Sequence, residues 1–358
     1  MNSFKYFAVF YVEALYYLPH FLPVADEMGK RGLPHGWLFS KETIKDSGSI
    51  IDRLGLHLIK GMPENAEAEA DFFIFGNGYD KLASVPGDTA LIYHGIGTKA
   101  CYYERDLNRF NIRFVEGEYR RRELDSRSPD RMQERPVVGF SKLDPVVRFS
   151  PADREASIIS LGLAPSRKTV LYAPTYYPSS IELMGENFPD DCRGMNLIIK
   201  PHQFTYTKKY RRQFMILNSW EKRDNVYLAN YEDFNALPFF AISDVMISDE
   251  SSTIFEFAAL GRPVIRNRFV KLRPSYRLFP WKLRKRMDMG IERYSDIAKD
   301  AYEYKETLRM LRETLTNPPL NQDTIKQYTL DLLGEVDGRV SERIVDYLFS
   351  RRRHSFTK

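Results

Sequence analysis

The sequence has little cysteine: only Cys101 and Cys192 occur among its 358 residues. Such sparse use indicates free thiols in a reducing compartment, and a single disulfide between the two is the alternative. We therefore expect a cytoplasmic protein.

Long apolar runs are also missing. The N-terminal apolar run is interrupted by Glu13, and Pro19 and His20 follow soon after. This is far short of the ~20 apolar residues that a membrane-spanning helix needs. No small-residue cleavage site follows, so a signal peptide is not expected either. We expect a protein that is soluble, or attached only peripherally to the inner face of the cell membrane.

A strong charge imbalance is absent as well, since the formal net charge is +5. This mild positive charge suits an anionic ligand or membrane surface, and the basic residues do not gather with aromatic ones into a nucleic-acid-binding stripe. The sequence has no HExxH, paired CxxC, EF-hand, Walker or dinucleotide motif, and no G-x-S-x-G surrounds Ser251. We expect no metal, no cofactor, no nucleic-acid partner and no hydrolase nucleophile.

What the chain does have is a repeated alternation of short apolar runs with amphipathic stretches, which is typical of βα units in a parallel sheet. The expected strands form two series, at 6–12, 35–40, 56–60, 71–76, 89–94 and 112–117, and at 168–174, 196–202, 226–230, 244–248 and 262–267. They predict an α/β protein with two doubly wound, Rossmann-like domains. A proline-rich stretch between the series places these domains at 1–150 and 151–335, with a C-terminal helix and basic tail at 336–358.

Ligands of open α/β sheets bind beyond the carboxyl ends of the strands, and the strand at 244–248 ends in unusual chemistry. Two acids and three hydroxyls follow it, namely Asp249, Glu250, Ser251, Ser252 and Thr253. A helix comes next, and a helix N-terminus attracts phosphate, to which hydroxyl side chains can add donors. Ordinary helix capping is the alternative. Glu256, one turn into the helix, suits a ribose diol better than a phosphate.

A second strand end carries His94. Gly95 and Gly97 follow and allow close approach of the backbone, and Lys99 is near enough along the chain to hold an anion. A histidine that faces a cleft from a strand end can act as a general base near neutral pH. A core or surface histidine beside a glycine turn, with a solvated lysine, is the alternative.

A third strand end contains Lys200, Pro201 and His202. A lysine and a histidine together can neutralise a diphosphate, and the proline stops the strand. The strand at 168–174 leads into Thr175 and Tyr176, which add a hydroxyl and an aromatic ring at a further strand end.

Five segments, in this order and spacing, resemble the CDP-glycerol glycerophosphotransferases, which build teichoic-acid and related polyol-phosphate polymers. They are HGIGTK (94–99), GFSKLD (139–144), APTYYP (173–178), KPHQ (200–203) and DVMISDESSTIFEFAALGRPVI (244–265). The last block is long and specific, and the resemblance covers roughly residues 90–265.

The resemblance implies a GT-B-like fold, in which two Rossmann-like domains face a cleft. It also implies transfer of a polyol phosphate from a CDP-linked donor, with release of CMP. In that reaction His94 would be the general base, and His202 would help to hold the diphosphate and stabilise charge on the leaving CMP. The remaining donor-binding residues would be Thr175, Lys200, Ser251, Ser252, Thr253 and Glu256, with Gly95, Gly97 and Asp249 in support.

Two other functions are compatible with these residues. A GT-B glycosyltransferase or nucleotide-sugar epimerase shares a diphosphate site at a helix start, and a degenerate GT-B module would bind without catalysis. The acceptor implied by the resemblance is a lipid-linked or polymeric polyol or glycan. The basic and aromatic segment Lys271–Met289 is a candidate for peripheral contact with an anionic membrane, with an ordinary solvated loop as the alternative.

Overall fold

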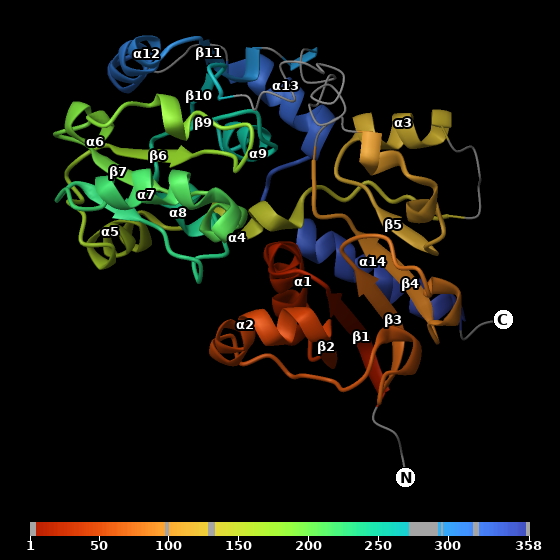
Figure 1. Cartoon of the computed structure of the whole chain (residues 1–358). Helices are drawn as coiled ribbons and strands as arrows, with labels where there is room; N and C mark the ends of the chain where they lie inside the picture. The colour runs from red at the N-terminus through yellow and green to blue at the C-terminus, as the bar shows by residue number, and fades with distance from the viewer. Residues whose placement is uncertain are drawn as a thin grey trace, which may run out of the picture. The chain divides into compact units, whose positions relative to one another are not determined.

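The computed structural model describes residues 5–96, 100–127, 133–271, 293–294, 296–317 and 322–355. The chain divides into two compact units (Figure 1). Met1–Ile96, Ala100–Pro145 and Leu330–Lys358 form the first unit, and Gly97–Lys99 with Val146–Thr329 form the second. The break near residue 145 falls close to the expected boundary, whereas the C-terminal residues, expected as a segment of their own, belong to the first unit.

The first unit is built on a parallel sheet with the strand order β2-β1-β3-β4-β5. Its strands are β1 (Lys5–Val12), β2 (His35–Phe39), β3 (Glu69–Phe75), β4 (Asp88–Ile92) and β5 (Ile112–Phe114). Its helices are α1 (Leu18–Lys30), α2 (Lys41–Arg53), α3 (Glu118–Arg127) and α14 (Val340–Ser355). Consecutive residues such as Val9 and Phe10 are both fully buried, as expected for a sheet covered on both faces.

The strand expected at 56–60 does not form. Leu58 makes a single bridge to Trp37 at the edge of the sheet, and its side chain is 45% exposed. Gly55 and Gly61 flank the segment with φ angles of 61° and 104°, which turn the chain away on both sides. The segment 56–60 is therefore too short to pair with β2 beyond this single bridge.

The second unit is built on a parallel sheet with the order β11-β10-β9-β6-β7-β8. Its strands are β6 (Thr169–Ala173), β7 (Asn196–Ile199), β8 (Val226–Leu228), β9 (Val245–Ser248), β10 (Val264–Asn267) and β11 (Lys299–Ala301). Its helices are α5 (Pro151–Ser160), α6 (Phe188–Asp191), α7 (Arg211–Trp220), α8 (Leu237–Ile242), α9 (Thr253–Ala258) and α12 (Tyr304–Thr316), while α4 (Asp144–Val147) and α13 (Gln322–Leu333) each contain residues of both units.

Both sheets have doubly wound strand orders. The first follows 2-1-3-4-5, and the second follows 3-2-1-4-5-6 when its strands are counted along the chain, as in dinucleotide-binding folds. The predicted fold class of two Rossmann-like α/β domains is therefore confirmed. β11 was not expected from the sequence, because Lys299–Ala301 contains one apolar residue. Its Asp300 is held by Arg266 of the neighbouring β10, at 2.5 and 2.8 Å.

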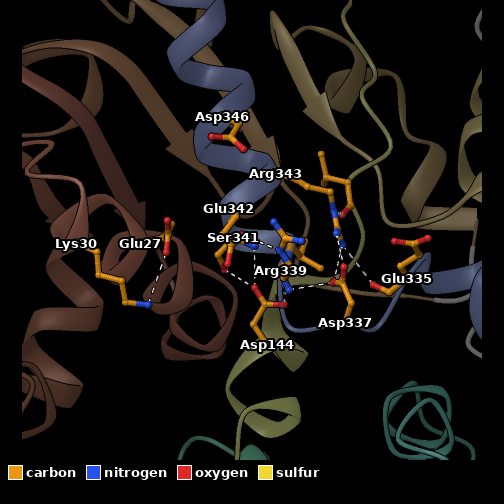
Figure 2. A network of polar contacts seen from close by, with 12 residues as sticks. Glu27, Lys30, Asp144, Glu335, Asp337, Arg339, Ser341, Glu342, Arg343 and Asp346 are labelled. Atoms are coloured by element: carbon orange, nitrogen blue, oxygen red, sulfur yellow. Dashed lines mark hydrogen bonds and ion pairs between the residues drawn. The ribbon is translucent and has the colours of Figure 1, made fainter.

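The segment GFSKLD (139–144) fastens α14 to the first unit (Figure 2). Asp144 is buried and accepts hydrogen bonds from the backbone N–H of Val340 at 3.2 Å and of Ser341 at 2.7 Å, and from the Ser341 hydroxyl at 2.7 Å. Gly139 has a φ of 103°, and a Cβ there would lie 2.7 Å from the Val340 side chain. Arg343 donates to the Val138 carbonyl at 2.7 Å. This segment thus caps a helix that lies almost 200 residues further along the chain.

Replacing Asp144 by alanine should lower the free energy of unfolding by about 2 kcal/mol or more, because two buried helix N–H groups lose their acceptor. Asp144→Asn keeps one acceptor oxygen and should lose less than half as much. Urea unfolding of both variants measures the difference. Equal stability of the alanine variant and the wild type would contradict the capping role of Asp144.

Candidate active site

The polar sequences that follow β6, β7 and β9 lie at neighbouring strand ends of the second sheet. β6 pairs with β9 so that Ala173 is opposite Ser248, and β7 lies on the other side of β6. The strand order reverses between β6 and β9, and such a switch point is where open α/β sheets bind their ligands. Thr175 and Asp249 therefore follow the ends of two adjacent strands, β6 and β9, and His202 follows the end of β7, on the other side of β6.

Asp249 ties the loop after β6 to the end of β9. Its buried carboxylate accepts hydrogen bonds from the Thr175 N–H at 3.0 Å, the Ser180 N–H at 3.2 Å and the Thr175 hydroxyl at 3.3 Å. Burial raises the pKa of Asp249 to about 6, and the hydrogen bonds from Ser180 and Thr175 oppose that rise. Asp249 thus fixes the shape of the loop 175–180.

The three hydroxyls before α9 differ in what they do. Ser251, which precedes the N-cap residue, accepts through Oγ from the Thr253 N–H at 3.4 Å and from the Thr253 hydroxyl at 3.0 Å, and so satisfies the first N–H of α9. Ser252 occupies the N-cap position, yet within the described residues its side chain makes no cap hydrogen bond. All three side chains are half-buried. Helix capping therefore accounts for Ser251 in part and does not account for the hydroxyl of Ser252.

Two charged residues of the predicted donor site are enclosed. Lys200, at the end of β7, is 8% exposed and donates to the Pro201 carbonyl at 3.1 Å. Glu256, on α9, is 3% exposed. Burial of a charge costs free energy unless other groups compensate it, so neither residue is the solvated surface charge that its type usually is.

His202 lies exposed beyond β7, in the loop that starts the short helix η8 (Gln203–Tyr206). Its Nδ1 accepts a hydrogen bond from the Phe204 N–H at 3.2 Å. The proton of the neutral ring is therefore assigned to Nε2, which makes Nε2–H a donor. The ring packs against Tyr176 of the neighbouring β6 loop, with centroids 4.7 Å apart, so the loops after β6 and β7 support each other.

His94 belongs to the first unit and follows β4. Its Nδ1 lies 2.7 Å from the carbonyl of Gly76, which follows β3. A carbonyl only accepts, so Nδ1 carries the proton and Nε2 keeps its lone pair. The rings of Tyr16, Tyr17 and Tyr93 lie 5.0, 4.9 and 4.6 Å from the imidazole. Burial lowers the pKa of His94 to about 4, although the hydrogen bond to Gly76 has a smaller, raising effect. The ring is therefore neutral at pH 7.

Several residues of these two regions were not predicted from the sequence. Nothing in the sequence singled out Ser180, whose contact with Asp249 joins positions 69 residues apart. Gly76 could have been included as a candidate because it ended an expected strand, whereas no motif or strand end in the sequence pointed to Tyr16 or Tyr17. The predicted supporting residue Gly97, and Lys99, lie outside the described residues. A Cβ at Gly95 would lie 2.9 Å from the Tyr102 hydroxyl, so a larger residue there would have to displace that side chain.

Within the described residues, no three or more His, Cys, Asp or Glu side chains are grouped to bind a metal ion. None of the helices in that part of the chain combines enough length and hydrophobicity to cross a bilayer. Cys192 is a buried, free cysteine, and burial raises the pKa of its thiol to about 12.

Two doubly wound parallel sheets with ligand-site chemistry at their strand ends define a GT-B-like protein, and solved structures of that class are similar to this chain. The wall teichoic acid polymerase TagF has a TM-score of 0.70 at 16% identity, over 98% of this chain and 90% of that one. The UDP-GlcNAc 2-epimerase of Neisseria meningitidis, bound to UDP-GlcNAc, has a TM-score of 0.59 at 14% identity, over 97% and 100%. At these identities the likeness shows the fold alone. No curated protein matches the chain.

The model of the CDP-Glycerol:Poly(glycerophosphate) glycerophosphotransferase family matches residues 131–350, more than half of the chain. The chain belongs to this family, and its reaction is CDP-glycerol-dependent transfer of a polyol phosphate. The predicted family, transferase class and CDP-linked donor are thereby confirmed, and the family supports this reaction over the epimerase and non-catalytic alternatives. The matched region contains the whole strand-end site of the second unit, and His94 precedes it.

Proposed function

We propose that the chain transfers glycerol phosphate, or a similar polyol phosphate, to a hydroxyl of a cell-envelope glycan or polyol-phosphate acceptor. The acceptor oxygen forms a bond to the distal phosphorus of the CDP-linked donor, and the bond from that phosphorus to the CMP oxygen breaks. CMP leaves with the electron pair, and the proton of the acceptor hydroxyl goes to His94. The observation that carries the proposal is the set of loops at the switch point between β6 and β9, where Asp249 fixes Thr175.

We assign the following roles to the donor residues. Ser252 offers a hydroxyl that the helix does not use, and with Ser251 and Thr253 it binds the diphosphate. The Nε2–H of His202 donates to the leaving CMP, because its Nδ1 is held by the Phe204 N–H. Lys200 adds positive charge, and Glu256 binds the ribose. Asp249 does not touch the donor and acts by shaping the loop after β6.

His94 suits a general base for two reasons. Its Nδ1 proton is bound by the Gly76 carbonyl, so the free lone pair is on Nε2. Its low pKa, which results from burial, keeps that lone pair unprotonated at neutral pH. A histidine with a protonated ring could not accept the proton of the attacking hydroxyl.

Release of CMP tests the function directly. Purified chain is incubated with CDP-glycerol, and CMP is measured with and without a glycan or a glycerol-phosphate oligomer as acceptor. We expect CMP release that depends on the acceptor, together with one added phosphorus per transfer in the product. Absence of CMP release with each of several CDP-polyols, or conversion of UDP-GlcNAc instead, would overturn the proposal.

Ser252→Ala should weaken binding of CMP about tenfold or more, since a hydrogen bond to a charged group contributes about 1.5–3 kcal/mol. The melting temperature should not change, because Ser252 caps nothing among the described residues. Ser251→Ala should weaken binding and also lower the melting temperature. Calorimetric titration with CMP and thermal unfolding separate the two effects.

Ser150→Ala is the matched control for these serines. Ser150 caps α5, where its Oγ accepts from the Asp153 N–H at 3.2 Å. This variant should lower the melting temperature and leave the affinity for CMP unchanged. If Ser252→Ala behaves like Ser150→Ala, then Ser252 is only a cap and the proposed phosphate contact is wrong.

We propose further that the acceptor is lipid-linked and that the chain meets an anionic membrane through Lys271–Met289. Apart from Lys271, this segment lies outside the described residues, so its composition carries the proposal: seven Lys or Arg with Leu278, Phe279 and Trp281. Each basic residue near an anionic leaflet contributes about 1 kcal/mol. In a flotation assay, binding of the protein to anionic vesicles should decrease as the salt concentration rises. It should also decrease when Lys282, Arg284, Lys285 and Arg286 are changed to Gln. Equal binding to neutral vesicles, or none to either, would remove this role.

A further inference from the structure

The two carbonyl groups that follow His94 are each held by a side chain from elsewhere in the first unit. Arg120, on α3, donates from Nη2 to the Gly95 carbonyl at 3.2 Å. The hydroxyl of Tyr102 donates to the Ile96 carbonyl at 3.0 Å. Tyr102 belongs to the short helix η4 (Ala100–Tyr103). The turn after His94 is therefore fixed by contacts that His94 itself does not make.

These two side chains are themselves held in place. Arg120 is 3% exposed, donates from Nε to Glu116 at 3.0 Å, and lies over the Tyr102 ring at 4.4 Å. Arg113, on β5, donates to the Tyr102 carbonyl at 2.6 Å. Salt bridges and stacked guanidinium groups in such enclosed positions are rigid, because their hydrogen bonds fix both distance and plane.

The turn can approach these groups because residue 95 is a glycine. A Cβ at Gly95 would lie 2.9 Å from the Tyr102 hydroxyl and 3.1 Å from its ring. The imidazole of His94, which precedes this turn, is bound through Nδ1 to the Gly76 carbonyl at 2.7 Å. The imidazole of His94 is thus bound to the Gly76 carbonyl, and the two backbone carbonyls that follow His94 are bound by Arg120 and Tyr102.

We infer that Arg120 and Tyr102 are positioning residues, which hold the turn 95–96 so that His94 keeps its Nδ1 proton on Gly76 and presents Nε2 as the base. The inference rests on the proposed role of His94. A general base needs its lone pair within hydrogen-bond reach of the proton that it removes, and a displacement of about 1 Å can cost about 100-fold in rate. Neither side chain has to touch substrate for this effect.

The test compares Tyr102→Phe with Tyr103→Phe. The neighbouring Tyr103 also stacks on arginine, at 4.3 Å from Arg127 and 5.5 Å from Arg120, but its buried hydroxyl has no hydrogen-bond partner among the described residues. Tyr102→Phe should lower kcat about tenfold, which is the size of effect that the loss of one hydrogen bond produces, with the KM for CDP-glycerol unchanged. Its melting temperature should fall only slightly, because one buried hydrogen bond is lost. Tyr103→Phe should leave kcat unchanged. Equal kcat values for the two variants would overturn the inference.

Arg120→Lys provides a second variant that keeps the charge beside Glu116 and loses the fork that reaches Gly95. Arg120→Lys should lower kcat in the same way as Tyr102→Phe. Full retention of kcat would contradict the positioning role of Arg120. The ¹⁵N chemical shifts of the His94 imidazole give a readout that does not depend on catalysis. They should report the Nδ1–H tautomer in the wild type and in Tyr103→Phe, and a tautomer mixture in Tyr102→Phe. A wild type that releases no CMP would refute the proposed function, whereas unchanged shifts in Tyr102→Phe would refute the positioning role.

Discussion

His94→Ala is expected to slow polyol-phosphate transfer by ~10²–10⁴-fold, which is the usual contribution of a general base. The affinity for CMP should change by less than about twofold, because no donor contact is assigned to His94 and the proposed donor residues all belong to the second unit. His94→Asn should be as slow as the alanine variant. Its amide can still donate to the Gly76 carbonyl, yet it has no basic lone pair. Initial rates of CMP release and calorimetry with CMP measure both quantities.

His57→Ala is the control for this experiment. His57 is an exposed histidine of the same unit, and its Nε2 lies 2.7 Å from the Tyr6 hydroxyl. Its removal should leave the rate within about twofold of the wild type. A His94→Ala variant with a rate within about threefold of wild type would exclude the base role. A collapse of its melting temperature would instead identify His94 as a structural core residue.

The pH dependence of kcat/KM follows from the same geometry. Burial lowers the pKa of His94 to about 4, so the imidazole is the active base above that pH and is protonated, and inactive, below it. The acid limb of kcat/KM should therefore lie near pH 4, with no loss of rate between pH 5 and 7 that is due to this group. A limb near pH 6.5 that disappears in His94→Asn would contradict the buried, neutral state of the ring.

The positions of most candidate site residues were predictable from the sequence, because parallel sheets end in a few recognisable ways. An apolar run that stops at a histidine, or at a cluster of hydroxyls, marks a strand end, and His94, His202 and Ser251 all lie there in the structure. Their positions at the ends of strands can be predicted from the neighbouring residues alone. The same logic failed at 56–60, where two glycines with positive φ cut short a run of suitable composition.

Contacts between distant segments were not predictable. Asp249 was expected only as a supporting residue of the donor site, and the structure shows that it fixes the loop 175–180, which follows another strand. Asp144 was part of a motif without a stated role, and its partners are Val340 and Ser341. A single sequence shows which residues are unusual, but it does not show which of them meet, because the meeting depends on how the strands are ordered in the sheet.

Loss of His202 is the second large effect that we expect. His202→Ala should lower kcat by about 10²–10³-fold, which is the usual result of removing one donor that stabilises charge developing on a leaving group. The effect should appear in single turnovers, because the donor acts when the bond to CMP breaks. The KM for CDP-glycerol should change less than kcat, since the negative charge on the CMP oxygen increases toward the transition state.

Two further variants make this prediction specific to the Nε2–H group. Phe204→Ala removes the ring that lies 5.0 Å from His202 but keeps the N–H that holds Nδ1, so it should cost far less in kcat than His202→Ala. Tyr176→Ala removes the ring on the neighbouring loop, 4.7 Å from His202, and should have an intermediate effect because the imidazole loses one support. All four proteins should melt at similar temperatures, since His202 and Phe204 are exposed and Tyr176 is half-buried. If His202→Ala reacts as fast as Phe204→Ala, the histidine packs the loop and does not assist the departure of CMP.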